Sequence, residues 1–282
     1  MNVLSSISSL GDFNQKIPTE KDAVELLMEI GILADRRECI KCHNQMQLRT
    51  RKETFKWRCR QNQKDCSSKS VKAGSFFANC NLTLRNALKL IICWVNRWSG
   101  VQIEKELNNS PTTVGDWKNF LGELCKNIAE TYPRIGGRGK VVKIDESRIH
   151  VRKYGRGATR EQIWDVGSRT AKELIPIIRE HVDPSSTVIT DEWKAYSKLK
   201  DHFERHEKIC HATGFQRLAD DGLEVSTNLV EGSWKRMKDP LKNANGTSGD
   251  LLPSYLSEFI VREKEGDGFF NRIHGELKSK RE

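Results

Sequence analysis

Four cysteines in a short stretch place the strongest constraint on how this chain can fold. Cys39 and Cys42 are separated by two residues, and Cys59 and Cys66, sixteen residues further on, are separated by six. In an intracellular protein, cysteines bind metal or pack in a core more often than they form disulfides. Two pairs at this separation predict four thiolates around one tetrahedral zinc ion, with a β-hairpin between the pairs.

The second cysteine pair is wider than the usual spacing of two to four residues, so its loop must be longer. His43 or Cys80 could therefore replace one ligand, and four cysteines without metal are the alternative. A zinc ribbon this small buries little apolar surface, so metal binding would supply its folding free energy.

The same stretch is strongly basic. Residues 36–72 hold twelve Lys or Arg against three acids, in a chain of 282 residues with a formal charge of +10. Such a patch favours a polyanion, usually nucleic acid, and a solvated surface is the alternative. We expect Phe55 and Trp57 to pack beneath the hairpin. Phosphate contacts are expected from the basic side chains of the hairpin, Arg49, Arg51, Lys52 and Arg58.

Helices are predicted on both sides of this stretch. Residues 18–34 form a short helix with Thr19 as N-cap, and residues 83–98 form a largely buried helix. Residues 103–124 have the pattern of a helix, a tight turn and a second helix, capped by Ser110 or Thr112. In DNA-binding versions the second helix enters the major groove, although helical hairpins are common without DNA. Its expected buried face consists of Val114, Trp117, Phe120 and Leu121.

The C-terminal half alternates strands and helices, which predicts an α/β domain. Residues 131–140 have the Gly, Pro and basic content of a linker that precedes this domain. The polar chain after about residue 262 is expected to fray.

Three acids in this half lie in related settings. Asp145 follows the apolar run VVKI, Asp191 follows TVIT, and Glu231 lies in an amphipathic helix with Lys235 and Lys238 on one face. Carboxylates that converge from two strand ends and a helix can hold two Mg²⁺ or Mn²⁺ ions. Three ordinary surface acids are the alternative.

Together these motifs resemble those of Merlin-type transposases, which are related to bacterial insertion-sequence transposases with a DDE catalytic domain. The resemblance covers roughly residues 36–260 and rests on CIKC, WRC followed by GSFF, KIDES followed by KYGRG, VITDEWKAY and TNLVEGSWKRMK. It implies a ribonuclease H-like core and metal-dependent cutting and joining of DNA at terminal inverted repeats. The catalytic acids would be Asp145, Asp191 and Glu231.

The resemblance also implies that side chains near the acids lie close to the DNA strand. The DNA-binding residues predicted for this half are Lys153, Arg156, His211, Lys235 and Lys238. Pairing two transposon ends would require a homo-oligomer.

The sequence departs from the family pattern in two places. A His usually precedes the TN of the third motif, where this chain reads EVSTN. Only a short stretch separates the first strand from the helix over 169–182, so the early sheet is predicted to be shortened. The alternative function is therefore a domesticated or decayed zinc DNA-binding protein without catalysis, and a zinc-dependent protein-interaction module is a third reading.

We therefore predict five parts in an α/β chain: an N-terminal helix and leader (1–35), a zinc ribbon (36–80), a helix-turn-helix-like segment (81–130), a ribonuclease H-like DDE domain (136–265) and a polar tail (266–282). The N-terminal sequence lacks the features of a secretion signal, and no apolar stretch approaches the ~20 residues of a membrane span. We expect a protein without membrane association that is nuclear in a eukaryote and otherwise cytoplasmic.

Overall fold

The computed structural model describes residues 7, 9–61, 64–145, 170–210, 214, 216–243 and 251–280, with only the backbone for some of these, Glu231 among them. The chain divides into two compact units, Met1–Ile128 with Ile260–Glu282, and Ala129–Phe259. In the described parts of both units, no helix combines the length and apolar character needed to cross a membrane.

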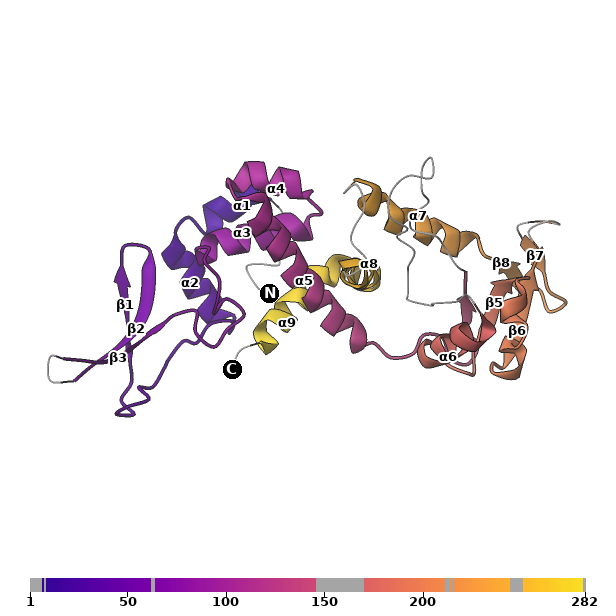
Figure 1. Ribbon diagram of the computed structural model, residues 1–282, viewed down its shortest axis with the longest axis horizontal. Coiled ribbons are helices and arrows are strands. Elements are labelled where there is room, and N and C mark those ends of the chain that lie inside the picture. Colours follow the sequence, from indigo (N-terminus) through magenta and orange to yellow (C-terminus); the bar gives the residue numbers. More distant parts are fainter. Residues whose placement is uncertain are drawn as a thin grey trace. The chain divides into compact units, whose positions relative to one another are not determined.

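A three-stranded antiparallel sheet forms the cysteine-rich segment (Figure 1). Its strands, in spatial order, are β1 (Gln47–Arg51), β2 (Thr54–Gln61) and β3 (Lys64–Ser70). The predicted hairpin is confirmed as β1–β2, and Lys52 adopts a left-handed conformation (φ 54°) in the turn. Phe55 and Trp57 are buried, as expected from their alternation with basic residues.

Two short helices precede this sheet and a longer one follows it: α1 (Leu10–Lys16), α2 (Glu20–Glu29) and α3 (Leu84–Val95). The Thr19 hydroxyl accepts from the Asp22 N–H at 3.2 Å, and the Asp22 carboxylate accepts from the Thr19 N–H at 2.8 Å. This reciprocal cap confirms the predicted start of α2. The Glu20 carboxylate accepts from the first two N–H groups of α3 at 2.7 and 2.8 Å, which fixes α2 against α3.

The predicted helical pair is present as α4 (Gly100–Leu107) and α5 (Pro111–Glu130). Ser110 Oγ accepts from the Thr113 N–H at 3.1 Å and so caps α5. Val114, Trp117 and Leu121 are buried, but Phe120 is 54% exposed, so the expected buried face is wrong at this position. At about 100° per residue, Phe120 lies roughly 90° around the helix from the centre of the buried stripe.

The predicted fraying of the C-terminal tail is wrong over most of its length. Helix α8 (Leu252–Glu265) is followed by α9 (Phe269–Ser279). Phe269, Ile273 and Leu277 are spaced four residues apart and are buried, so the polar composition conceals one apolar face.

Arg262 joins this C-terminal segment to α3 within the same unit. Its guanidinium donates to the carbonyls of Trp94 and Val95 at 2.8 Å each, and it is only 7% exposed. Its Cζ atom lies 4.8 Å from the ring centroid of Trp94 and 4.1 Å from that of Phe269. One side chain thus satisfies two helix-end carbonyls and fills the space between two aromatic rings.

Replacing Arg262 with Ala is therefore expected to lower the unfolding free energy of this unit by about 3 kcal/mol, because it exposes two helix-end carbonyls and leaves a cavity. Urea unfolding would measure the change, with hydrogen exchange of α3 and α9 assigning it to this unit. Arg262→Lys keeps the charge but loses the planar fork, and should give an intermediate loss. A loss below about 1 kcal/mol for the Ala variant would contradict this role.

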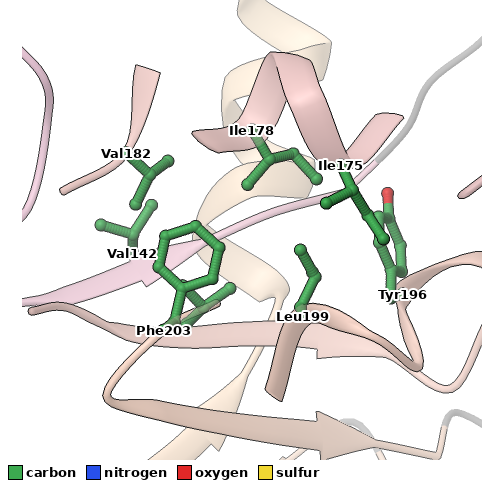
Figure 2. Close-up of a cluster of buried hydrophobic side chains, with 8 residues drawn as sticks. Val142, Ile175, Ile178, Val182, Tyr196, Leu199 and Phe203 are labelled. Atoms are coloured by element: carbon green, nitrogen blue, oxygen red, sulfur yellow. The ribbon is translucent and has the colours of Figure 1, made fainter. Parts of the chain in front are cut away.

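The second unit is built on a parallel sheet of β4 (Val141–Lys143), β5 (Thr187–Asp191) and β6 (Arg205–Ile209), in that order. Helix α6 (Ala171–His181), close to the predicted helix over 169–182, covers one face of the sheet. Figure 2 shows Ile175 of this helix beside Tyr196, and Ile178 in the same buried cluster as Val142 of β4, Leu199 and Phe203. The alternation of strands with helices confirms the predicted mixed α/β character.

A short hairpin covers part of the opposite face of this sheet. It consists of β7 (Gln216–Leu218) and β8 (Glu224–Ser226), and Val225 packs against Ile189 of β5 and Ile209 of β6. Helix α7 (Asn228–Asn243) follows directly, and its Met237 packs against Leu252 and Leu256 of α8. The hairpin therefore determines where α7 begins relative to the sheet.

The stretch predicted to be a linker is built into this unit. The Ile135 N–H donates to the His181 carbonyl at 2.8 Å, and the Asp183 N–H donates to the Ile135 carbonyl at 2.9 Å. Gly136 has a φ of +94°, and a Cβ there would lie 2.1 Å from Ser186 Oγ. Glycine is needed here because of the positive φ and because the chain passes so close to Ser186, just before β5, and to Val142 of β4.

The predicted shortening of the early sheet concerns residues 146–169, which lie outside the described residues. It therefore stays a prediction.

Candidate functional site

The four predicted cysteine ligands come together in one cluster. Their sulfur atoms all lie within 4.8 Å of one another, with Cys39 3.6 Å from Cys66 and Cys42 3.4 Å from Cys59. These distances exceed a disulfide bond by more than an ångström. They are close to the separation of about 3.8 Å expected for two sulfurs bound to one tetrahedral zinc ion. The cluster could thus hold a metal ion.

The backbone explains how the wide second pair joins the cluster. Cys39 and Cys42 lie in a tight turn in which the His43 N–H donates to the Cys39 carbonyl at 2.8 Å. Cys59 lies on β2 opposite Ser67 of β3, whereas the next residue, Arg60, lies opposite Asp65. Cys66 is therefore the extra residue of a β-bulge, a feature that redirects a side chain. Six residues separate Cys59 from Cys66 because the two cysteines lie on neighbouring paired strands, β2 and β3, and the chain between them includes the connection that joins these strands.

The alternative ligands are not part of the cluster. Among the described residues, the group of four cysteines contains neither His43 nor Cys80. The Cys80 thiol donates to the Leu82 carbonyl at 3.6 Å.

The thiols of the cluster differ in pKa because they form hydrogen bonds with one another and with Ser67. A hydrogen bond with Cys42, together with burial, raises the pKa of Cys59 to about 12. The Ser67 hydroxyl, 2.9 Å from Cys39 Sγ, lowers the pKa of Cys39 to about 6. Four thiolates so close together would repel one another, and a divalent cation would remove that repulsion.

The outer face of the ribbon sheet is basic. Cross-strand partners share a face, and Arg49 lies opposite Lys56. The positions of β1 and β2 that share this face are Gln47, Arg49, Arg51, Thr54, Lys56, Arg58 and Arg60. On β3, Asp65 is the register partner of Arg60. Of the predicted phosphate contacts, Arg49, Arg51 and Lys52 are exposed and Arg58 is half-buried. This face has the charge and exposure to bind a polyanion.

The helical pair differs from the ribbon in charge. Residues 100–130, which span α4 and α5, contain five acidic and three basic residues. A surplus of acids repels phosphates, so charge favours the ribbon over the helical pair as the phosphate-binding element.

Asp145 and Asp191 lie at the same level of the parallel sheet. The register pairs Val141 with Thr187 and Lys143 with Ile189, and the Ile144 N–H donates to the Ile189 carbonyl at 2.8 Å. Continued by two residues, this register places Asp145 beside Asp191, with neighbouring strands about 4.8 Å apart. The interval of 46 residues between the two acids equals the register offset of the two strands.

Both aspartates also belong to the same face of the sheet. Val142, Ile144 and Val188 pack with α6, whereas Ile189 packs under β8 on the opposite face. Because side chains alternate along a strand, Asp145 and Asp191 lie on the face opposite α6, where β8 leads into α7.

Glu231 lies in the first turn of α7, and its side chain is outside the described residues. The start of this helix is tied to β4, since Lys143 Nζ lies 3.4 Å from Oγ of Ser226, the last residue of β8. This side-chain contact links the residue just before the helix that carries the third acid to the strand that leads to the first one.

Residues not predicted from the sequence hold Asp191 in place. Its Oδ1 accepts from the Trp193 N–H at 2.9 Å, and its carbonyl accepts from the Thr190 hydroxyl at 2.7 Å. Thr190 Oγ1 also lies 2.9 Å from Nε2 of His206 on β6, and burial lowers the pKa of this histidine. The contact with His206 has no signal in the sequence, because it depends on which strands are neighbours. The contacts with Trp193 and Thr190 are local, and a turn after Asp191 could have indicated the first of them.

The predicted DNA contacts of the second unit are described only in part. Lys235 is exposed and Lys238 half-buried on α7. Lys153, Arg156 and His211 lie outside the described residues.

The motifs of the second unit have counterparts in known proteins. Residues 126–264 match the ISXO2-like transposase domain. The matched residues make up just under half of the chain and include Asp145, Asp191 and Glu231. The match supports a DDE transposase and does not single out the Merlin type.

A relative in Haemophilus influenzae, described as an uncharacterized transposase-like protein, is 34% identical over 85 residues. The match covers 30% of this chain and 65% of that protein, slightly less than two thirds of its length. No solved structure matches the chain.

Proposed function

We propose that the chain is a DDE transposase that cuts DNA at terminal inverted repeats and joins the freed ends to a target. The observation that carries this proposal is the parallel register of β4 and β5, which would bring Asp145 beside Asp191 if it continued two residues past Lys143 and Ile189. The match to an ISXO2-like transposase domain supports it.

The donor set fits hard divalent cations. Carboxylate oxygens are the ligands that Mg²⁺ and Mn²⁺ prefer, and two strand neighbours about 4.8 Å apart can share a pair of ions about 3.5–4 Å apart. Asp145, Asp191 and Glu231 would hold these ions. When bound, the metals would activate water or a 3′-hydroxyl and stabilise the leaving oxygen.

The residues of the chain would then orient the acids. The Trp193 N–H occupies one oxygen of Asp191, which leaves the second oxygen to face the site. Thr190 and His206 fix the backbone at the same residue. Such support matters because catalytic ligands must be held within about 0.5 Å of their productive positions.

We further propose that the basic face of the ribbon binds the phosphate backbone, with zinc in the cysteine cluster maintaining the fold of the ribbon. Lys153, Arg156, His211, Lys235 and Lys238 would contact the strand near the acids, as in the Merlin-type resemblance. The catalytic core would be ribonuclease H-like, and a homo-oligomer would hold two DNA ends.

A cleavage assay tests the proposed function directly. Purified protein and Mn²⁺ would be added to DNA that carries the inverted repeats flanking the gene of this protein. We expect strand breaks at the repeat ends, which disappear when EDTA removes the metal. Specific binding without any cleavage over a range of Mg²⁺ and Mn²⁺ concentrations would favour the domesticated DNA-binding protein instead.

Salt dependence tests the proposed role of the ribbon. The double substitution Arg49→Ala and Lys56→Ala should reduce the slope of log affinity against log salt by about 2, since each lost phosphate contact contributes about 0.9. Binding to duplexes of different sequence, measured between low and moderate salt, would give this slope. The matched double substitution Lys118→Ala with Lys126→Ala on α5 should leave the salt slope nearly unchanged. A smaller slope for this α5 variant, with an unchanged slope for the ribbon variant, would show that the helical pair binds the phosphates.

A further inference from the structure

Lys143 is a charged residue near the proposed carboxylate site, and the function proposed above gives it no role. It precedes Asp145 by two residues, so strand alternation places both residues on the face opposite α6. Its register partner on β5 is Ile189, which is fully buried together with Val225 of β8. Lys143 itself is half-buried and therefore borders the layer between the sheet and the β7–β8 hairpin.

The ammonium group of Lys143 reaches the junction between β8 and α7. Its Nζ lies 3.4 Å from Oγ of Ser226, and Ser226 is only 2% exposed. The fully buried Thr227 follows, and α7 begins at Asn228. Glu231 lies one turn further on, so any displacement of Ser226 shifts the start of the helix that carries Glu231.

We propose that Lys143 is a positioning residue: through Ser226 it holds the first turn of α7, and with it Glu231, against the strand that leads to Asp145. The inference rests on the proposed function, to which it adds a residue that supports the third acid.

The three acids differ in how the fold fixes them. Asp191 is the last residue of β5 and Asp145 follows β4 by two residues, and these strands pair through backbone hydrogen bonds, so the sheet sets the separation of the two acids. Glu231 lies on a helix that meets the sheet through side chains, Val225 on β8 and Ser226 at the junction. The contact between Lys143 and Ser226 therefore affects the position of Glu231, which the strand pairing does not fix.

A substitution of Lys143 changes metal affinity in two opposite ways, through the loss of its charge and through the release of α7. Removing its positive charge would strengthen binding of a divalent cation, whereas releasing α7 would weaken it. Ser226→Ala removes the hydrogen-bond acceptor and keeps the charge of Lys143. It is therefore the cleaner variant, and Lys143→Arg, which keeps both charge and donor, is the conservative control.

The test is a double-substitution cycle on the full chain with Lys143→Met, Ser226→Ala and both together. Hydrogen exchange of residues 228–231 in metal-free protein gives one measurement, and Mn²⁺ binding followed by electron paramagnetic resonance gives the second. Ser226→Ala should speed exchange about threefold and weaken Mn²⁺ binding about tenfold. The same change should have no further effect when Lys143→Met is already present. Ser233→Ala, further along α7, and Lys143→Arg should behave as the wild type.

The outcomes separate this inference from the function on which it rests. Equal effects of Ser226→Ala with and without Lys143→Met would show that Ser226 acts without Lys143 and would overturn the inference, as would tighter Mn²⁺ binding by Ser226→Ala. If the wild type binds no Mn²⁺, the proposed function fails. A coupled change in hydrogen exchange would in that case still support Lys143 as the residue that holds α7.

Discussion

Replacing Asp191 with Asn is expected to reduce metal-dependent DNA cleavage and joining by about a thousandfold or more, which corresponds to about 4 kcal/mol in the activation barrier. The amide keeps the size of the side chain and can still accept the hydrogen bond from the Trp193 N–H, so the local turn should survive. What it loses is the negative charge that would hold the metal. Gel-based cleavage and strand-transfer assays with Mg²⁺ and Mn²⁺ would measure the effect.

DNA affinity should change little in this variant, because the substitution leaves the basic side chains proposed to contact DNA unchanged, both on the ribbon and near the acids. The neighbouring acid provides a matched control: Glu192 is exposed and follows the end of β5. Glu192→Gln removes the same charge one residue away and should retain activity within about threefold. Full activity of the Asp191→Asn protein would remove Asp191 from the catalytic triad.

The second large effect is expected from Cys59→Ser. Cys59 is a buried member of the cluster, 3.4 Å from Cys42, and lies on the strand that also carries Lys56 and Arg58. Structural zinc contributes about 10–16 kcal/mol of apparent binding free energy, which a small sheet cannot replace. We expect zinc content to fall from one ion per chain to well below one, together with unfolding of the ribbon and loss of most DNA affinity.

Elemental analysis would give the zinc content, and limited proteolysis would report cleavage within residues 36–72. Cys80→Ser is the matched control, because Cys80 lies outside the cluster of the described residues. Chelation of zinc in the wild type should reproduce the Cys59→Ser result. Unchanged DNA binding by the zinc-free protein would show that DNA binding does not require the metal, which would contradict this prediction.

Several features of the fold were predictable because they depend on neighbours along the chain. Thr19 and Ser110 cap helices through hydrogen bonds to N–H groups three residues away, which residue type and spacing alone indicate. The alternation of Phe55 and Trp57 with basic residues likewise identifies the two faces of β2. Local periodicity was less informative for α9, where a polar composition hid an apolar face.

The exposed position of Phe120 illustrates the limit of such patterns. Val114, Trp117 and Leu121 correctly mark a buried stripe, but the width of that stripe depends on what packs against the helix. The partner is a matter of tertiary structure, so an apolar residue at the margin of the stripe cannot be assigned from the sequence.

Residue types and local spacing along the chain identify the groups available for chemistry: four cysteines, a basic hairpin, and acids at the ends of two apolar runs. Which of these groups meet depends on how distant segments pack. Strand register pairs the segment before Asp145 with the segment before Asp191, a β-bulge directs Cys66 into the cluster, and a side-chain contact joins Lys143 to Ser226. These are pairings between segments far apart in the chain, and a shift of one residue in register would move every side chain of a strand to the other face.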